Sequence, residues 1–230
     1  MKILAFETAT EACSVALYID GEIRERFDVV PKQHTALALP WAEQLLAEAG
    51  VKKSQLDAIA VGIGPGAFTG VRLAVALVQG IALALDKPVL PVSTLAALAM
   101  QGIDLKPERI LAAIDARMGE IYCAEFELDS DGLVQAVSEE IVIAPDAYHH
   151  ASGHPLVGVG TGFSAINNTL QLNLGSRLLH CRADALPHAA DVARIAARYF
   201  KLGKMIAPDL LEPAYLRNKV ALTLKEQGKS

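Results

Sequence analysis

The pattern of apolar and polar positions predicts the same series of secondary-structure elements at two places along the chain. In each copy a short apolar run is followed by two strand-like runs, and turn signals such as Asp20-Gly21 separate them. The runs lie at 2–6, 13–19 and 22–30 in the first copy, and at 110–114, 120–128 and 133–143 in the second. We therefore expect three strands joined by tight turns at the start of each half.

Further helices and strands are predicted between and after these two three-stranded meanders. The pattern predicts helices at 41–50, 71–85, 94–100 and 189–201, strands at 58–62, 89–92 and 156–160, and an extended segment at 206–213. The sum is an α/β protein of two halves, 1–103 and 104–230, each with a mixed sheet that opens in a three-stranded meander and is flanked by helices. The last helices and the tail either stay with the second half or return to pack on the first. This is the layout of the actin-like (ribonuclease H-like) ATPase superfamily, in which nucleotide lies between the halves.

The helix predicted at 71–85 has no polar face. Only Arg72 and Gln79 interrupt its apolar sequence, so we expect it to be covered on all sides. Thr69 is placed to cap its first turn. One face can pack on a sheet while another admits a second helix, which can belong to another protein. Small residues that would allow this approach recur every fourth position in two rows, Gly66/Gly70/Ala74 and Ala76/Gly80/Ala84.

Composition narrows the class of protein. The 230 residues carry a formal net charge of -5, which disfavours strong autonomous binding to nucleic acid, because such binding needs a basic footprint. Three widely spaced cysteines without a CxxC pair predict no disulfide framework. The N-terminus meets Glu7 too early for a signal peptide, and no apolar run reaches the ~18 residues that span a bilayer. We expect a soluble, cytoplasmic protein without membrane contact.

Two motifs invite a binding-site interpretation. The glycine-rich turn at 64–70 resembles a phosphate cradle but lacks the Lys-Ser/Thr ending of a Walker loop, so a structural turn is favoured. His149, His150 and His154 would suit zinc on a helix, but Gly153 and Pro155 favour a solvated loop. We therefore expect no metal site in this chain.

Charged residues give a second set of candidates. Glu7 and Asp115 stand at equivalent turns and would orient magnesium or water in an actin-like ATPase; otherwise they cap turns and complete a polar cleft floor. Together with Thr8, Gly160 and Gly162 they outline a vestigial nucleotide cleft. Basic residues near the C-terminus form either a contact for RNA phosphate or a solvated face. They are Arg194, Arg198, Lys201, Arg217 and Lys219.

Four motifs together resemble the bacterial TsaB family of threonylcarbamoyladenosine biosynthesis proteins. They are FETATEACSVAL at 6–17, GIGPGAFTGVRLAVALVQGIALAL at 62–85, DARMGEIYCA at 115–124 and YLRN at 215–218. The resemblance covers essentially the whole chain and implies the actin-like fold. It also implies a role in placing threonylcarbamoyl on the adenosine beside the anticodon of tRNAs that read codons starting with A. In that machinery TsaD, a larger homologue, carries the metal and transfers the group, and a small ATPase, TsaE, joins them.

The resemblance implies a non-catalytic subunit. In TsaD a Val-Asn-His-x-x-x-His pattern supplies two histidines to the metal, and Thr94 and Leu98 stand at those positions here. A leucine cannot ligate a metal, and one hydroxyl replaces two imidazoles poorly. The chain alone should bind no cofactor tightly, with ATP and the metal in its partners and tRNA reached through the complex. The alternative is a small actin-like ATPase or phosphotransferase that uses Glu7 and Asp115.

The resemblance further implies pairing with TsaD through the first half. The 41–50 and 71–85 helices then pack against their counterparts, and a tryptophan at Ala74 should block the approach. Without the partner, the apolar face should drive formation of an isologous homodimer. Contacts are expected at Leu37, Trp41, Leu45, Val71, Ala74, Val75 and Val78.

Overall fold

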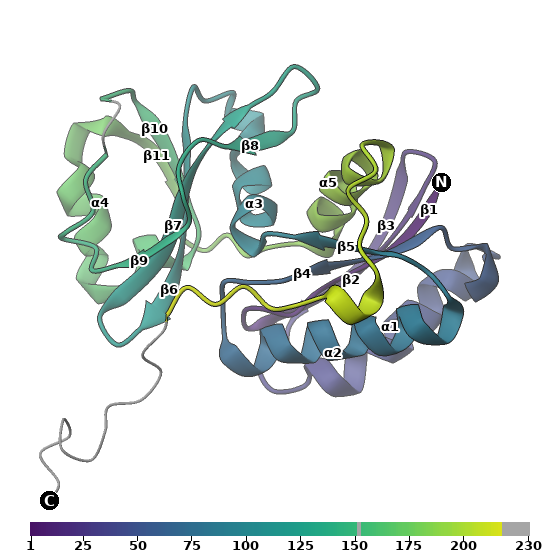
Figure 1. Cartoon of the computed structure of the whole chain (residues 1–230). Coiled ribbons are helices and arrows are strands. Elements are labelled where there is room, and N and C mark those ends of the chain that lie inside the picture. Colours follow the sequence, from purple (N-terminus) through teal and green to yellow (C-terminus); the bar gives the residue numbers. More distant parts are fainter. Residues whose placement is uncertain (151–152, 218–230) are drawn as a thin grey trace, which may run out of the picture.

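The computed structural model describes residues 1–150 and 153–217, which form two mixed β-sheets with helices packed against them (Figure 1). The first sheet has the strand order β3-β2-β1-β4-β5. Its strands are β1 (Lys2–Glu7), β2 (Ala12–Ile19), β3 (Glu22–Val29), β4 (Ala58–Gly62) and β5 (Val89–Val92). The first three form an antiparallel meander, and β4 and β5 continue the sheet parallel to β1.

The second sheet repeats this arrangement. Its order is β11-β10-β6-β7-β8, and β9 also pairs with β7. Its strands are β6 (Ile110–Arg117), β7 (Glu120–Leu128), β8 (Val134–Ala136), β9 (Ile141–Ile143), β10 (Leu156–Val159) and β11 (Leu178–Arg182). β6, β7 and β8 form the meander, and β10 and β11 continue parallel to β6. Both sheets therefore share one connectivity, which confirms the predicted duplicated α/β fold.

The last strand of the second meander differs from its prediction. The run at 133–143 is split into β8 and β9, which pair with opposite ends of β7. The break has a local cause, because the Ser138 hydroxyl accepts the amide of Glu125 at 2.8 Å where a ladder bond would otherwise continue. A side-chain hydrogen bond of this kind competes with the sheet and ends the strand.

Helices cover both faces of the first sheet. α1 (His34–Glu48) and α2 (Phe68–Leu85) pack on one face and α5 (Ala189–Lys201) on the other, while α3 (Thr94–Ala99) lies between α5 and the second sheet. α4 (Thr169–Leu174) covers the outer face of the second sheet. Short 3-10 turns are η1 (Lys53–Gln55), η2 (Met100–Leu105), η3 (Thr161–Phe163), η4 (Ile166–Asn168), η5 (Gly175–Arg177) and η6 (Pro208–Leu210).

Two helix starts differ from the sequence prediction. α1 begins at His34 and contains Pro40, whose exposed position lets water satisfy the carbonyl that a proline leaves unbonded. α2 begins at Phe68 and its N-cap residue is Ala67, which makes no side-chain capping bond. Thr69 therefore lies inside the first turn, and its predicted capping role is wrong.

Helix α5 connects the second half to the first sheet. Its buried residues pack against β1 and β2, and it also contacts α3. One core cluster contains inward residues of both sheets together with α3 and α5. The last helix thus returns to pack on the first half, one of the two arrangements that the sequence left open.

Side chains of the first sheet fix the start of α5. The Ser14 hydroxyl accepts the amide of Ala189 at 2.9 Å and donates to Glu25 at 2.7 Å. The Glu25 carboxylate also accepts the amide of Ala190 at 3.0 Å. Nδ1 of His188 lies 3.0 Å from Glu25, and its ring stacks on Phe27 with centroids 4.0 Å apart. Residues from β2 and β3 therefore satisfy amides that a helix start leaves without an intrahelical partner.

Replacing Ser14 tests this docking. We expect Ser14→Ala to lower the free energy of unfolding by about 1–3 kcal/mol, because the buried Ala189 amide loses its acceptor and Glu25 loses a donor. Urea denaturation measures the effect. Ser164→Ala, at an exposed serine, serves as the control and should stay within about 0.5 kcal/mol. An unchanged midpoint for Ser14→Ala would contradict the capping role.

Residues 204–217, here called the strap, run from α5 over α2 to the second sheet (Figure 1). Ile206 exchanges two backbone hydrogen bonds with Val89. The Gln79 side chain donates to the carbonyls of Pro208 at 3.2 Å and Leu211 at 3.0 Å. The amide of Ala214 donates to the carbonyl of Ile63 at 2.8 Å. The predicted extended segment is thus present but interrupted by η6, and it ties α2 to the second half.

Helix α2 is long and apolar enough to cross a membrane by length and composition. It has 18 residues with a mean hydropathy of 1.8, contrary to the prediction that no run reaches this length. One row of its side chains, from Ala74 to Ala82, packs on the first sheet in a core cluster with β1 and β4. This is the packing of a core helix in a globular fold, which passes the same test of composition.

Candidate functional site

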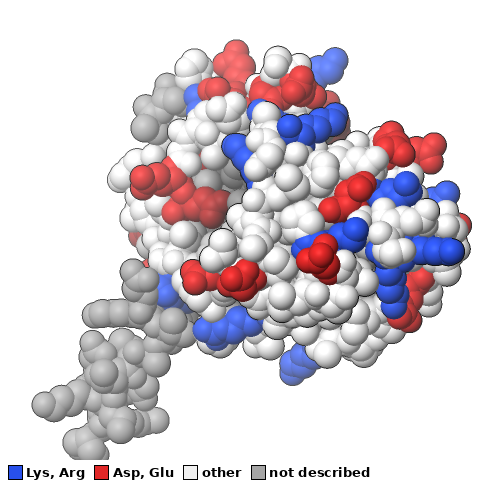
Figure 2. Space-filling model, turned by 45° about the vertical axis from the view of Figure 1, so that its right-hand side comes forward, with Lys and Arg blue, Asp and Glu red and all other residues white. Residues whose placement is uncertain are grey.

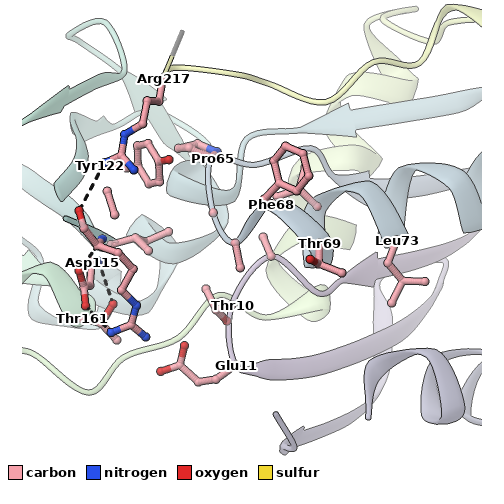
Figure 3. Close-up of a pocket in the computed structure, with 18 of the residues that line it drawn as sticks. Thr10, Glu11, Pro65, Phe68, Thr69, Leu73, Asp115, Tyr122, Thr161 and Arg217 are labelled. Carbon is pink, nitrogen blue, oxygen red and sulfur yellow. Dashed lines mark hydrogen bonds and ion pairs between the residues drawn. The ribbon is translucent and has the colours of Figure 1, made fainter. Parts of the chain in front are cut away.

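A groove of about 860 Å³ lies between the two halves. One wall carries the β1–β2 turn with Thr10 and Glu11, and the start of α2 with Phe68 and Thr69 (Figure 3). The opposite wall carries Asp115, Tyr122 and Thr161 of the second half, and the end of the strap completes the lining (Figure 3). We call this space the inter-half groove. It is the counterpart of the cleft predicted from the actin-like layout.

Glu7 and Thr8 lie beneath this groove and do not line it. Both are buried, and one Glu7 oxygen accepts the amide of Ala9 at 2.7 Å while the other accepts the hydroxyl of Thr94 at 3.0 Å. Burial raises the pKa of Glu7 to about 7, although these hydrogen bonds pull in the opposite direction. Glu7 is therefore part of the supporting structure.

Asp115 does line the groove, but its carboxylate is already engaged. It accepts the backbone amide of Arg117 at 2.8 Å and pairs with the Arg117 guanidinium at 2.7 Å. Its own amide donates to Thr161 Oγ1 at 3.1 Å. The two carboxylates predicted to be equivalent therefore differ: Glu7 is buried below the groove, whereas Asp115 lines it and is held by Arg117 within its own turn.

The glycines at the predicted cleft pack closely against the backbone of neighbouring segments, with no room for a side chain. A Cβ at Gly66 or Gly70 would overlap the carbonyl oxygen of Ala9 or Thr8, and a Cβ at Gly160 would overlap that of Ala113. Gly162 likewise packs against Ala113. These glycines let the turns approach the ends of β1 and β6, which gives both turns a structural role.

Thr94 and Leu98, the two residues that the resemblance sets against the metal-binding histidines of TsaD, are both buried. The Thr94 hydroxyl donates to Glu7 and accepts the amide of Gly64 at 3.1 Å, so it connects β1 to the glycine turn. Leu98 lies in the core cluster between the sheets. Within residues 1–150 and 153–217, no three His, Cys, Asp or Glu side chains gather as a metal site would require.

The histidine string differs from the predicted solvated loop. His150 is buried, with Nδ1 2.8 Å from Glu125 and Nε2 2.8 Å from the carbonyl of His154. The Tyr148 hydroxyl donates to the same Glu125 oxygen at 2.6 Å. The burial of His150 therefore depends on its bond to Glu125, which is remote in sequence. The neighbouring glycine and proline, on which the prediction of a solvated loop rested, carry no information about this contact.

The basic residues near the C-terminus are paired within the chain. Arg194 pairs with Asp191, Arg198 with Asp129, and Arg217 with Glu120 at 2.5 Å. Lys201 is exposed, and Lys219 lies outside the described residues. On the face shown in Figure 2, acidic and basic side chains are intermixed. The three arginines thus have structural partners within the chain, which favours the structural interpretation over a contact for RNA phosphate.

A second candidate surface is the outward side of α1 and α2, here called the α1/α2 face. Leu83 is 63% exposed and Leu39 45% exposed, and a hollow of about 250 Å³ between the two helices is lined by Leu39, Ile81 and Ala84 among others. The exposed or half-buried residues of the face are Leu39, Phe68, Leu73, Ala76, Leu77, Gly80, Ile81, Leu83 and Ala84. The first sheet covers only one side of α2, so the expectation of complete cover is wrong within this chain.

This placement corrects most of the predicted partner contacts. Leu37 and Trp41 are half-buried, but the other five residues belong to the core under the α1/α2 face. Those five are Leu45, Val71, Ala74, Val75 and Val78. A tryptophan at Ala74 would therefore disrupt the core and would not report on a partner. A helix that is apolar all round gives no sequence signal for which row faces the sheet, so the sequence of α2 could not show that Val78 lies inward and Leu83 outward.

The duplicated sheets and the groove between them define an actin-like α/β protein. The family model TsaD, tRNA N6-adenosine threonylcarbamoyltransferase, matches residues 28–223. The tRNA threonylcarbamoyladenosine biosynthesis protein TsaB of Escherichia coli (strain K12) is 42% identical over 232 residues, 96% of each chain. The protein of that name from Haemophilus influenzae is 36% identical over 230 residues, 96% of this chain and 95% of that one.

A solved structure agrees with these relatives. YeaZ from Pseudomonas aeruginosa superposes with a TM-score of 0.86 at 40% identity, and the match covers 94% of this chain and 99% of that one. The chain belongs to the TsaB proteins, and the resemblance read from its four motifs is confirmed. Its function lies in tRNA threonylcarbamoyladenosine biosynthesis.

Proposed function

We propose that this chain is the non-catalytic scaffold and activator subunit of the complex that forms threonylcarbamoyladenosine. It acts by dimerising with the catalytic, metal-containing homologue TsaD through the α1/α2 face. A TsaE-type small ATPase is the third protein, and tRNA is reached through the complex in the cytoplasm. ATP and the metal belong to the partners, so this chain needs no tightly bound cofactor.

The exposed apolar side of α2 carries this proposal. Monomeric proteins rarely leave large apolar patches uncovered, and α2 exposes Leu83 with Ala76, Gly80 and Ala84 around it. Small residues allow a second helix to come close, and the adjoining hollow between α1 and α2 offers a socket for an apolar side chain. The same face also supports the proposal that the isolated chain forms a homodimer, because a C2 interface uses one patch twice.

The hydrogen bonds of the two carboxylates support a non-catalytic role for this chain. Glu7 is buried and bonded to Thr94 and Ala9, and Asp115 is held by Arg117, so neither is poised to orient a magnesium ion or a water. Thr94 and Leu98 offer one hydroxyl and an alkyl group where the homologue has histidines. The alternative, an ATPase using Glu7 and Asp115, is therefore less well supported.

A charge placed on the α1/α2 face tests the docking site. We expect Leu83→Arg to weaken association with TsaD at least tenfold, because a guanidinium would lose water in an apolar interface. Affinity is measured by titration calorimetry, and tRNA threonylcarbamoylation is measured in the reconstituted system with this chain present, omitted or supplied without TsaD.

The matched control is Leu172→Arg, because Leu172 on α4 is 78% exposed and lies on the other half. It should leave the affinity for TsaD unchanged. Modification that continues at the same rate when this chain is omitted would overturn the activator role. Unaltered binding by Leu83→Arg would overturn the docking site while leaving the activator role intact. Light scattering of the isolated chain should report a dimer for the wild type and a monomer for Leu83→Arg.

A further inference from the structure

The start of α5 is a place where the second half of the chain is attached to the first sheet. The segment 183–188 leaves β11 and enters α5, which packs against β1, β2 and β3 (Figure 1). A helix start presents amides without intrahelical partners, and Glu25 of β3 accepts the amide of Ala190 at 3.0 Å. A carboxylate at this end of a helix also interacts favourably with the helix dipole. The attachment of α5 therefore depends on the charge of one carboxylate.

His188, the N-cap residue of α5, is the cationic partner of Glu25. Its Nδ1 lies 3.0 Å from one carboxylate oxygen, while the other oxygen accepts the Ser14 hydroxyl at 2.7 Å and the Ala190 amide. The His188 ring stacks on Phe27 with an interplanar angle of 7°, which fixes its orientation. The side chains of His188 and Glu25 are 26% and 21% exposed. The pair is thus partly shielded from water and still open to exchange of protons with it.

The surroundings change the pKa of both partners. Burial by itself would lower the pKa of His188, but the hydrogen bond and the charge of Glu25 outweigh burial, so this pKa lies above its ordinary 6.5. Burial would raise the pKa of Glu25, but the hydrogen bonds from His188, Ser14 and the Ala190 amide outweigh it, so this pKa lies below its ordinary 4.5. Both directions are those expected of an ion pair.

Polar contacts continue from this pair to both connections between the halves. Asp191 and Arg194 of α5 also face His188; the first favours the charged imidazole and the second opposes it. They pair with each other, and the Gln101 side chain of η2 donates to Asp191. The Arg182 guanidinium, at the end of β11, donates to the Gln101 carbonyl. The start of α5 is therefore linked to η2 and to the segment 183–188.

We propose that His188 and Glu25 form a pH-sensitive latch that holds the start of α5, and through it the second half, against the first sheet. With His188 protonated, the latch is an imidazolium–carboxylate pair with a charge-assisted hydrogen bond. Loss of this proton leaves Glu25 a partly buried carboxylate with a neutral partner, and the start of α5 opens more often. α5 and the α1/α2 face lie on opposite faces of the first sheet, so the latch does not rest on the proposed docking of TsaD.

The pH range of the latch follows from the directions of the two pKa values. Because folding raises the pKa of His188, the stabilisation from its charge is complete below pH 6.5 and is lost as the pH rises through the folded pKa. Because folding lowers the pKa of Glu25, its contribution is complete above pH 4.5 and is lost as the pH falls through the folded pKa. The latch is therefore strongest between pH 4.5 and 6.5.

NMR spectroscopy of the full chain tests the latch without any substitution. Titration of the His188 ring should give a pKa above 6.5. Hydrogen exchange, corrected for its intrinsic pH dependence, should show the protection of the Ala189 and Ala190 amides falling about fivefold more than that of amides in β1 and β4 between about pH 6 and pH 8.5. A wild-type pKa of His188 at or below 6.5 would overturn the proposal. So would an equal change in all three elements, because the whole chain would then be unfolding.

Glu25→Gln identifies the partner of His188. It should lower the pKa of His188 to 6.5 or below, because burial then acts without the opposing carboxylate, and it should remove the extra pH dependence at the start of α5. Glu22→Gln, at an exposed position of the same strand, is the matched control and should leave both measurements unchanged. A pKa of His188 that stays raised in Glu25→Gln would assign the effect to Asp191 and overturn the latch.

Discussion

Glu7→Gln should make the protein more stable than the wild type at neutral pH, and this advantage should disappear in mild acid. The folded state raises the pKa of Glu7 from its ordinary 4.5 to about 7, chiefly because the carboxyl is fully buried. Ionised Glu7 is therefore more costly in the folded than in the unfolded chain. Glutamine keeps the shape of the side chain and carries no charge.

The sign of the pH dependence follows from the raised pKa. Between pH 4.5 and about 7 the folded chain holds a proton on Glu7 that the unfolded chain has released, so the stabilising contribution of Glu7 is complete below pH 4.5 and is lost as pH rises to about 7. At 1.36 kcal/mol for each pKa unit, the loss is about 3 kcal/mol. The difference in unfolding free energy between Glu7→Gln and wild type should change by that amount in favour of glutamine.

Urea denaturation of both proteins at several pH values between 4 and 8 measures this difference. Glu22→Gln, at an exposed position in β3 of the same sheet, serves as the control and should show little pH-dependent difference. A constant difference between Glu7→Gln and wild type across this range would show that Glu7 titrates as an ordinary carboxyl. A wild type that becomes relatively more stable at high pH would reverse the predicted sign.

Gly70→Ala and Gly80→Ala should have opposite effects although both glycines lie in α2. A Cβ at Gly70 would overlap the Thr8 carbonyl oxygen, and the Thr8 hydroxyl donates to the Gly70 carbonyl at 2.8 Å, so the helix is locked against β1 there. We expect Gly70→Ala to cost roughly 3 kcal/mol, because helix and strand end must separate. At Gly80 nothing lies within 4 Å of the added methyl group, and alanine should stabilise the helix by about 0.5–1 kcal/mol.

Thermal and urea unfolding of the two variants check this pair. The isolated chain has to be examined at low concentration, so that the proposed self-association through the α1/α2 face does not mask the intrinsic effect at exposed Gly80. Equal changes in stability for the two variants would contradict the close approach of α2 to β1. Destabilisation by Gly80→Ala in the dilute chain would show that this part of the helix is covered within the monomer.

Much of the fold could be predicted from the sequence, because the patterns that indicate strands and turns are local and occur in both halves. Alternating strands, Gly-containing turns and an acidic residue at the end of the first strand in each copy predicted two equivalent meanders, and both sheets have them. Motifs spread over the whole chain were enough to place it among the TsaB proteins.

Side-chain placement depended on contacts between segments far apart in the sequence. The α2 sequence is apolar on every side, so only its packing on the first sheet decided that Ala74 and Val78 face inward and Leu83 outward. His150 is buried because it bonds to Glu125, and the turn residues next to His150 could not predict this contact. Phe68, Arg72 and Tyr215 meet because the strap returns across α2. Patterns along the chain therefore determined the elements and the family, whereas burial and juxtaposition were decided by tertiary structure, because they depend on which distant surfaces exclude water together.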